Sequence, residues 1–195
     1  MQAKNPPFDR LFFGKRLLME RKSQPMFYLE TERLIITEFT PEMAQAVHEN
    51  SLDEDNRRFV PDEVFETVED AAETIEFLRS QYGGAQGPFV YPVLLKDGTY
   101  VGYVQAVPLG KGEWEIGYHI GARYTKRGYA AEAVRAFLPV IMKQLGITEM
   151  TGLCLAANLA SRRVMEKTGF ISEYEGIGNY QGAQQEICRY RYRLR

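Results

Sequence analysis

The stretch YTKRGYAAEA at residues 124–133 constrains the fold of this chain more than any other. Lys126 and Arg127 precede Gly128, and a run of good helix formers follows the glycine at once. The N-terminus of a helix leaves about four backbone N–H groups without intrahelical partners and carries roughly half a positive charge. Gly128 lets a ligand approach the backbone closely, and the two cations add positive field. The sequence therefore predicts a helix start that binds an anion such as a pyrophosphate.

Composition excludes several classes of protein. The chain has 195 residues, enough for one domain with a sizeable core, and its net charge of -2 argues against a dedicated nucleic-acid binder. Cys154 and Cys188 lack metal-ligand spacing and fit a reducing compartment better than a disulfide scaffold. No run approaches the ~18 consecutive apolar residues of a membrane span, and charges interrupt the apolar residues 8–19, unlike a secretory signal. We therefore expect a soluble, cytoplasmic protein that binds neither nucleic acid nor membrane and holds no metal.

Charge is distributed unevenly along the chain. Between Glu49 and Glu76, eleven acidic residues stand against two arginines, whereas residues 121–195 hold twelve basic and six acidic residues. If the fold keeps these regions apart, one end of the molecule favours cations and the other favours anions; the alternative is a pair of solvated helix faces. The four arginines within residues 188–195 alternate at strand period, which indicates a solvated strand face rather than a nucleic-acid stripe.

Hydrophobic periodicity and turn residues divide the chain into alternating helices and strands. Residues 1–28 look like an N-terminal extension, and residues 29–195 form the folded domain. The predicted strands cover residues 34–37, 89–95, 100–107, 114–120, 150–156, 170–174 and 187–194, and the predicted helices begin at Pro41, Val68, Gly128 and Asn158. This order mixes antiparallel hairpins with one βαβ-like passage, so we expect the α+β class with a mixed sheet.

Single residues predict local features of these elements. Thr40 and Thr67 are expected to cap the two early helices, because hydroxyl side chains accept hydrogen bonds from free N–H groups. Pro92 cannot donate to a sheet, so it implies an edge position or a bulge in the strand 89–95.

Four stretches in this order resemble the GNAT superfamily of acetyl-CoA-dependent N-acetyltransferases. They are LETERLIITEF at residues 29–39, WEIGYHIGARYTKRGYAAEA at 114–133, NLASRRVMEKTGF at 158–170 and GNYQGAQQEICRYRYRL at 178–194. The resemblance is closest to the group that includes the bacterial ribosomal-protein N-terminal alanine acetyltransferases. It implies the GNAT fold, a mostly antiparallel twisted sheet of about seven strands flanked by about four helices.

The resemblance also implies where acetyl-CoA binds. In this family the pantetheine lies in a V between the fourth and fifth strands, here residues 114–120 and 150–156, and backbone N–H groups hold the pyrophosphate. The family motif Gln/Arg-x-x-Gly-x-Gly/Ala corresponds to residues 125–130, in which Thr125 departs from the first position. Because main-chain donors make these contacts, that departure need not abolish binding. The residues expected to hold the cofactor are Tyr118, Ile120, Lys126, Arg127, Gly128, Tyr129, Ala130, Ala131, Asn158 and Ser161.

The implied reaction is direct transfer of the acetyl group to a neutral amine, which requires a base and an acid. Many relatives place a tyrosine acid seven residues after the motif Asn158, but Met165 occupies that position and cannot donate a proton. Asn158 and Ser161 match the family's Asn-x-x-Ser/Ala, although Asn158 also fits a plain helix cap. Ser161 is therefore the candidate acid, with Tyr174 and Tyr180 as alternatives.

Glu115 and His119 are the candidate bases, and they share one face of the predicted strand 114–120. An ordinary imidazole pKa near 6.5 suits proton relay at neutral pH, but a lone histidine in a strand is more often structural, so Glu115 is preferred. Some relatives use a glutamate after the Gly-Phe motif; Glu173 and Glu175 lie near that place, which this chain does not clearly fill.

The acceptor is expected to be a cationic amine, because the acidic segment between Glu49 and Glu76 borders the acceptor groove in this family. The leading hypothesis is acetylation of a protein N-terminus. The alternatives are a small-molecule amine acetyltransferase, acting on a polyamine, an aminoglycoside or an amino acid, and a non-catalytic acyl-CoA-binding module, since fold does not fix activity. A monomer and a homodimer are both compatible with the sequence.

Overall fold

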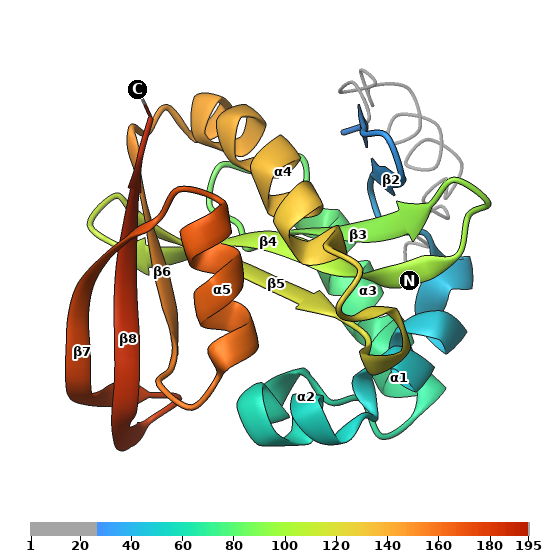
Figure 1. The fold of residues 1–195 in the computed structure, drawn as a ribbon. Helices are drawn as coiled ribbons and strands as arrows, with labels where there is room; N and C mark the ends of the chain where they lie inside the picture. The colour runs from blue at the N-terminus through green and yellow to red at the C-terminus, as the bar shows by residue number, and fades with distance from the viewer. Residues whose placement is uncertain (1–26, 195) are drawn as a thin grey trace, which may run out of the picture.

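One sheet of eight strands organises residues 27–194, the part of the chain that the computed structural model describes (Figure 1). The strands are β1 (Leu29–Glu30), β2 (Leu34–Ile36), β3 (Phe89–Leu95), β4 (Tyr100–Gly110), β5 (Glu113–Ile120), β6 (Glu149–Leu155), β7 (Ile171–Tyr180) and β8 (Ala183–Arg193). Their order across the sheet is β1-β2-β3-β4-β5-β6-β8-β7. Only β5 and β6 are parallel neighbours, because a helix joins them.

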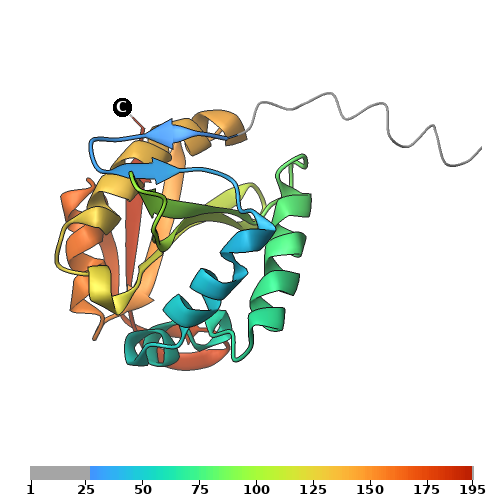
Figure 2. The ribbon, with the colours of Figure 1, turned by 90° about the vertical axis from the view of Figure 1, so that its right-hand side faces the viewer.

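Helices cover both faces of this sheet. The α-helices are α1 (Ala44–Ser51), α2 (Glu54–Phe59), α3 (Val68–Gln81), α4 (Tyr129–Leu145) and α5 (Leu159–Lys167), and the short 3-10 helices are η1 (Pro41–Met43), η2 (Pro61–Glu63) and η3 (Ala122–Tyr124). Figure 2 shows α4 on one side of the sheet and α1 and α3 on the other. Ile116 and Phe137 belong to the core under α4, while Ile75 and Tyr100 belong to a second core under α1 and α3.

The predicted α+β class with a mixed, mostly antiparallel sheet is confirmed. Residues 27–194 hold eight strands and five α-helices, against the expected seven and four or so. The additional elements are the two-residue β1 and the six-residue α2, which are too short to show a periodic pattern. Asp53 caps α2 by accepting a hydrogen bond of 2.8 Å from the backbone N–H of Asn56.

One of the two predicted threonine caps forms as expected. Thr67 and Asp70 make a reciprocal capping box at the start of α3, with hydrogen bonds of 3.1 and 3.0 Å. Thr40 also occupies an N-cap position before Pro41, but its side chain makes no capping hydrogen bond. The helical segment begins at Pro41 as predicted, but its first turn is the 3-10 helix η1 and the predicted side-chain cap is absent.

The edge position predicted for Pro92 is also wrong, because β3 lies between β2 and β4. Pro92 is tolerated since it lies opposite Thr37, immediately past the end of β2, and its carbonyl accepts a hydrogen bond of 3.3 Å from the Thr37 N–H. The predicted bulge is present beside it, as a register shift between Val93 and Leu94.

The hairpin of β7 and β8 is longer than the predicted strands 170–174 and 187–194, because its exposed distal half lacks apolar alternation. Arg191 and Arg193 form ion pairs with Glu149, as the predicted solvated strand face requires. Arg195 and residues 1–26 of the predicted extension lie outside the described residues. Phe27, the first described residue, stacks on Tyr91 with ring centroids 3.9 Å apart. Among the described helices, none is long and apolar enough to cross a membrane.

Candidate active site

The parallel strands β5 and β6 separate after a short paired stretch and form a V. Their pairing is limited to Glu115 with Thr151 and Ile116 with Gly152. Beyond that point each strand remains paired only with its outer neighbour, β5 with β4 and β6 with β8. The inner edge of β5 therefore presents backbone N–H and C=O groups without a partner strand, and Tyr118 and Ile120 lie on this edge.

The Tyr118 hydroxyl reaches from β5 to the first turn of α5. It lies 2.9 Å from Ser161 Oγ and donates a hydrogen bond of 3.0 Å to the Ser161 carbonyl. Burial raises the pKa of Tyr118 well above its ordinary value, so the phenol stays protonated at neutral pH. The sequence predicted main-chain contacts at Tyr118 but not this side-chain contact, because the two residues are 43 positions apart.

The other residues that the sequence singles out around the acid position have different surroundings. Asn158 caps α5 and accepts a hydrogen bond of 3.0 Å from the Ser161 N–H. Met165 is buried, and its thioether lies over Gly152 within the core. The Tyr174 hydroxyl donates to the carbonyl of Ile177 within its own hairpin.

The predicted anion-binding loop precedes α4. Gly128 has φ of 85°, a left-handed conformation that favours glycine, and Lys126 has φ of 61°. The first intrahelical bond runs from the Glu132 N–H to the Gly128 carbonyl, at 3.1 Å. The N–H groups of residues 129–131 precede that bond and have no acceptor within residues 27–194. Because Lys126 and Arg127 are exposed beside them, the loop can bind an anion.

Arg33, which no sequence motif marks as part of this site, holds the loop in place. Its guanidinium forms an ion pair of 2.5 Å with the carboxylate of Glu132 and donates to the carbonyl of Arg127 at 2.9 Å. It also lies over the ring of Tyr129, 4.8 Å from the centroid. Thr31 Oγ1 donates to the same carboxylate at 2.6 Å. These contacts join residues up to 101 positions apart, so no local pattern reveals them.

Glu115 lines a cavity of ≈ 420 Å³ bordered by residues of β4, β5 and β6 and of the β7–β8 hairpin. The cavity is also lined by Leu109, Thr151, Leu153, Tyr174, Ile177, Gly178, Asn179, Ile187 and Arg189. Burial raises the pKa of Glu115 to about 7, and no described residue forms an ion pair with it. A carboxyl with this pKa is able to accept a proton near neutral pH.

His119 follows Glu115 on the same face of β5, as predicted, and lies beside Asp53. Its Nε2 is 3.8 Å from Asp53 Oδ2, and its ring centroid is 5.8 Å from that of Tyr103. The imidazole, together with the backbone N–H groups of Asn56 and Ala122, lowers the pKa of Asp53 to about 2. Asp53 is therefore ionised at neutral pH.

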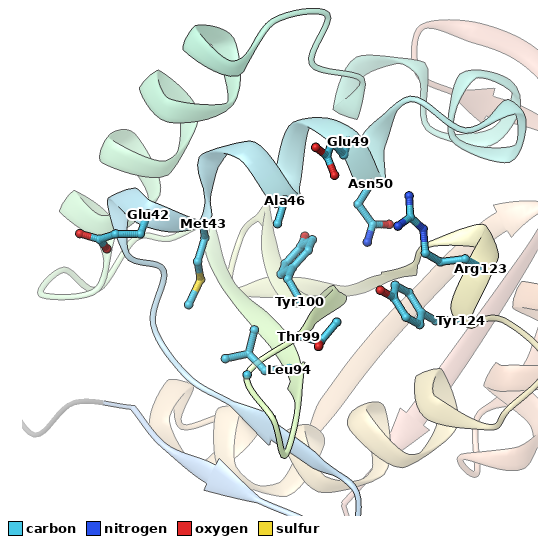
Figure 3. A pocket seen from close by; sticks show the side chains of 11 residues that line it. Glu42, Met43, Ala46, Glu49, Asn50, Leu94, Thr99, Tyr100, Arg123 and Tyr124 are labelled. Atoms are coloured by element: carbon cyan, nitrogen blue, oxygen red, sulfur yellow. The ribbon is translucent and has the colours of Figure 1, made fainter.

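A second hollow of ≈ 370 Å³ lies between α1, the β3–β4 turn and η3 (Figure 3). Side chains of Glu49, Asn50, Tyr100 and Tyr124 border it, and none of the predicted site residues does. The described residues contain no group of three or more His, Cys, Asp or Glu side chains suited to a metal ion.

The chain is similar to acetyltransferases of known sequence and structure. A family model described as an acetyltransferase (GNAT) domain matches residues 33–171. YnaD, an uncharacterized N-acetyltransferase of Bacillus subtilis strain 168, is 32% identical over 148 residues, covering 75% of this chain and 84% of YnaD. A GNAT-family acetyltransferase from Bacillus anthracis has a TM-score of 0.72 at 27% identity, covering 86% of this chain and 98% of that chain.

A more distant solved structure is RimL, a ribosomal L7/L12 alpha-N-protein acetyltransferase in complex with coenzyme A. Its TM-score is 0.74, and the match covers 86% of this chain and 98% of RimL. Because the identity is only 14%, this likeness shows a common fold and nothing further.

Proposed function

The chain belongs to the GNAT acetyltransferase family and is an N-acetyltransferase, and from this premise we propose that its acceptor is the N-terminal amine of a protein. The observation that carries the proposed reaction is the V between β5 and β6, with the Tyr118–Ser161 pair inside it and Glu115 on one of its strands. The activity in the name of RimL, whose fold this chain shares, supports a protein N-terminus as the acceptor.

In this proposal the acetyl donor is acetyl-CoA, and the chain holds it mainly through its backbone. The N–H groups of residues 129–131 bind the pyrophosphate, with positive field from Lys126 and Arg127. The unpaired edge of β5 at Tyr118 and Ile120 binds the amides of the pantetheine. The unpartnered N–H groups ahead of α4 are the structural feature that fits this donor.

Three side chains then supply the proton transfers. Glu115 takes the proton from the amine as its nitrogen bonds to the acetyl carbon. Ser161 gives a proton to the departing sulfur as the carbon–sulfur bond breaks, and the Tyr118 hydroxyl, 2.9 Å from Ser161 Oγ, holds that hydroxyl in position. His119, beside Asp53, is the second candidate base.

The acceptor is cationic in this proposal, because Glu115 and Asp53 both lie on the face of the sheet that it would approach. Carboxylates attract ammonium groups and raise their local concentration. A small-molecule amine is the second candidate acceptor, and it is favoured by the size of the cavity beside Glu115, ≈ 420 Å³, which suits a small ligand.

An acceptor screen with acetyl-CoA tests this function. The purified protein is given peptides with a free N-terminus, polyamines and neutral or acidic amines, and release of coenzyme A is followed. We expect turnover of peptides, with basic acceptors faster than acidic ones. Faster turnover of acidic acceptors would contradict the cationic acceptor, and coenzyme A binding without any turnover would favour a non-catalytic module.

Removing the Arg33 guanidinium should weaken binding of the acetyl donor. In an Arg33→Met variant we expect KM for acetyl-CoA to rise about 10-fold with little change in kcat, since hydrogen bonds to charged groups contribute about 1.5–3 kcal/mol. The carbonyl of Arg127 and the carboxylate of Glu132 lose their shared partner, so the loop is no longer fixed. Arg163→Met is the matched control, because Arg163 is exposed on α5. An unchanged KM in R33M would show that the loop needs no such support.

A further inference from the structure

Glu63, the last residue of η2, has a buried carboxylate oxygen without a partner. Its Oε2 is shielded from solvent and makes no hydrogen bond within residues 27–194. Its Oε1 accepts a hydrogen bond of 3.2 Å from Gln105 Nε2. Buried carboxylates normally have all their oxygens paired, so Oε2 is free to accept a hydrogen bond from a group outside the described residues.

The surroundings of Glu63 hold this carboxyl in position. Gln105 on β4 pairs with Gly117 on β5, and a Cβ added at Gly117 would lie 2.5 Å from Gln105 Nε2. Glycine at this position therefore lets the amide lie across β5 and reach Glu63.

The tip of the β7–β8 hairpin fixes the segment around Glu63 from the other side. The Tyr180 hydroxyl donates to the Phe59 carbonyl at 2.9 Å, and Gln181 Nε2 donates to Asp62. The β7–β8 hairpin and the segment around Glu63 are far apart in the sequence and thus meet beside the Glu63 carboxyl. Neither of them neutralises this carboxyl.

Glu63 and Glu115 occupy different places in the same region. Glu115 lies on β5 two residues before Gly117, and the amide of Gln105, which donates to Glu63, extends over Gly117. Residues 115 and 117 share one face of the strand, so the two carboxyls lie over the same face of the sheet. Glu115 belongs to β5 itself, whereas Glu63 belongs to η2.

We propose that Glu63 binds a second cationic nitrogen of the acceptor, distinct from the amine that is acetylated. Glu115 then serves the reacting amine, and Glu63 selects acceptors that carry another ammonium group at a distance. A peptide with lysine after its N-terminal residue and an alkyl diamine both have this chemistry. This inference rests on the proposed acetylation of amines, and it adds a residue that determines which amines are accepted.

The test compares acceptors that differ by one cationic group. The pairs are the peptide amides Ala-Lys-Gly-Tyr and Ala-Gln-Gly-Tyr, and cadaverine and pentylamine. We expect the protein to prefer the acceptor with the additional cation about 10-fold in kcat/KM in at least one pair, since hydrogen bonds to charged groups are stronger than those between neutral groups. The responding pair tells whether the acceptor is a peptide or a polyamine.

The variant Glu63→Gln keeps the shape and the hydrogen bond from Gln105 but removes the charge. It should abolish the preference and leave turnover of the acceptor without the additional cation unchanged. Glu73→Gln, an exposed position on α3, is the matched control and should keep the preference. A preference that persists in E63Q, or none in the unsubstituted protein, would overturn the inference.

A binding measurement separates this inference from the proposed function. If no amine is acetylated, the proposed function fails, and the unfolding temperature with coenzyme A and cadaverine still reports on Glu63. We expect cadaverine to raise that temperature more than pentylamine does, and the difference to vanish in E63Q. If cadaverine and pentylamine raised the unfolding temperature of the unsubstituted protein equally, or if their difference persisted in E63Q, the second cation site would be contradicted.

Discussion

Replacing Glu115 by glutamine should lower kcat/KM for the acceptor about 100- to 1,000-fold, which is the usual contribution of a positioned general base. Glutamine keeps the shape of the side chain in the cavity but cannot accept the proton of the attacking amine. KM for acetyl-CoA should change little, because Glu115 and the loop before α4 belong to different parts of the V. Initial rates measured while the acceptor and acetyl-CoA are each varied in turn give both quantities.

The direction in which kcat/KM changes with pH follows from the pKa of Glu115. Burial raises the pKa of Glu115 from 4.5 to about 7, and only the deprotonated carboxylate is a base. In the unsubstituted protein kcat/KM should therefore rise with pH through about 7 and then level off. In E115Q this limb should be absent, while any limb from the acceptor's own ammonium group remains.

Glu113→Gln is the control for E115Q, because Glu113 lies on the same strand and is exposed. If E115Q kept both its rate and the limb near pH 7, Glu115 would not be the base. His119→Asn would then be the next variant to measure, since His119 shares the face of β5 with Glu115.

The parts of this fold that the sequence predicts are those set by local chemistry. The capping box of Thr67 and Asp70 and the left-handed Gly128 before α4 depend on neighbouring residues only. The run of strands and helices from residue 89 to 170 likewise follows from apolar periodicity, which reports the burial of one face.

The parts that the sequence does not predict depend on which strands become neighbours. Tyr118 meets Ser161, and Arg33 meets Glu132, only after the sheet is assembled. Gln105 meets Glu63 for the same reason, at a separation of 42 residues. No periodic pattern records such pairs, and they include the contacts on which the proposed specificity depends.

Only some of the acidic residues between Glu49 and Glu76 lie where they can contribute to a binding site. Glu69, Glu73 and Glu76 are exposed on α3, as the alternative of a solvated helix face requires. Asp53 and Glu63, from the same acidic segment, instead face β5 and β4 through His119 and Gln105. Position relative to the sheet, rather than the total charge, therefore decides which carboxylates can reach an acceptor.

Removing the two hydroxyls inside the V should show whether they act as one unit. We expect Ser161→Ala to lower kcat about 100-fold, within the range of general acid catalysis, and Tyr118→Phe to lower it only about 10-fold. The Tyr118 hydroxyl is 2.9 Å from Ser161 Oγ, so in our proposal it acts through Ser161. The double variant should then be no slower than S161A alone, because groups that act together are not additive.

Stability measurements keep this result separate from unfolding. Tyr118→Phe removes a partly buried hydrogen bond and should cost about 1 kcal/mol, whereas S161A leaves the helix cap from Asn158 to the Ser161 N–H in place. Ser172→Ala, at an exposed position on β7, is the control. If the losses in the two single variants multiplied in the double variant, each hydroxyl would donate independently. Tyr118 would then be a proton donor in its own right, in place of the tyrosine that Met165 replaces.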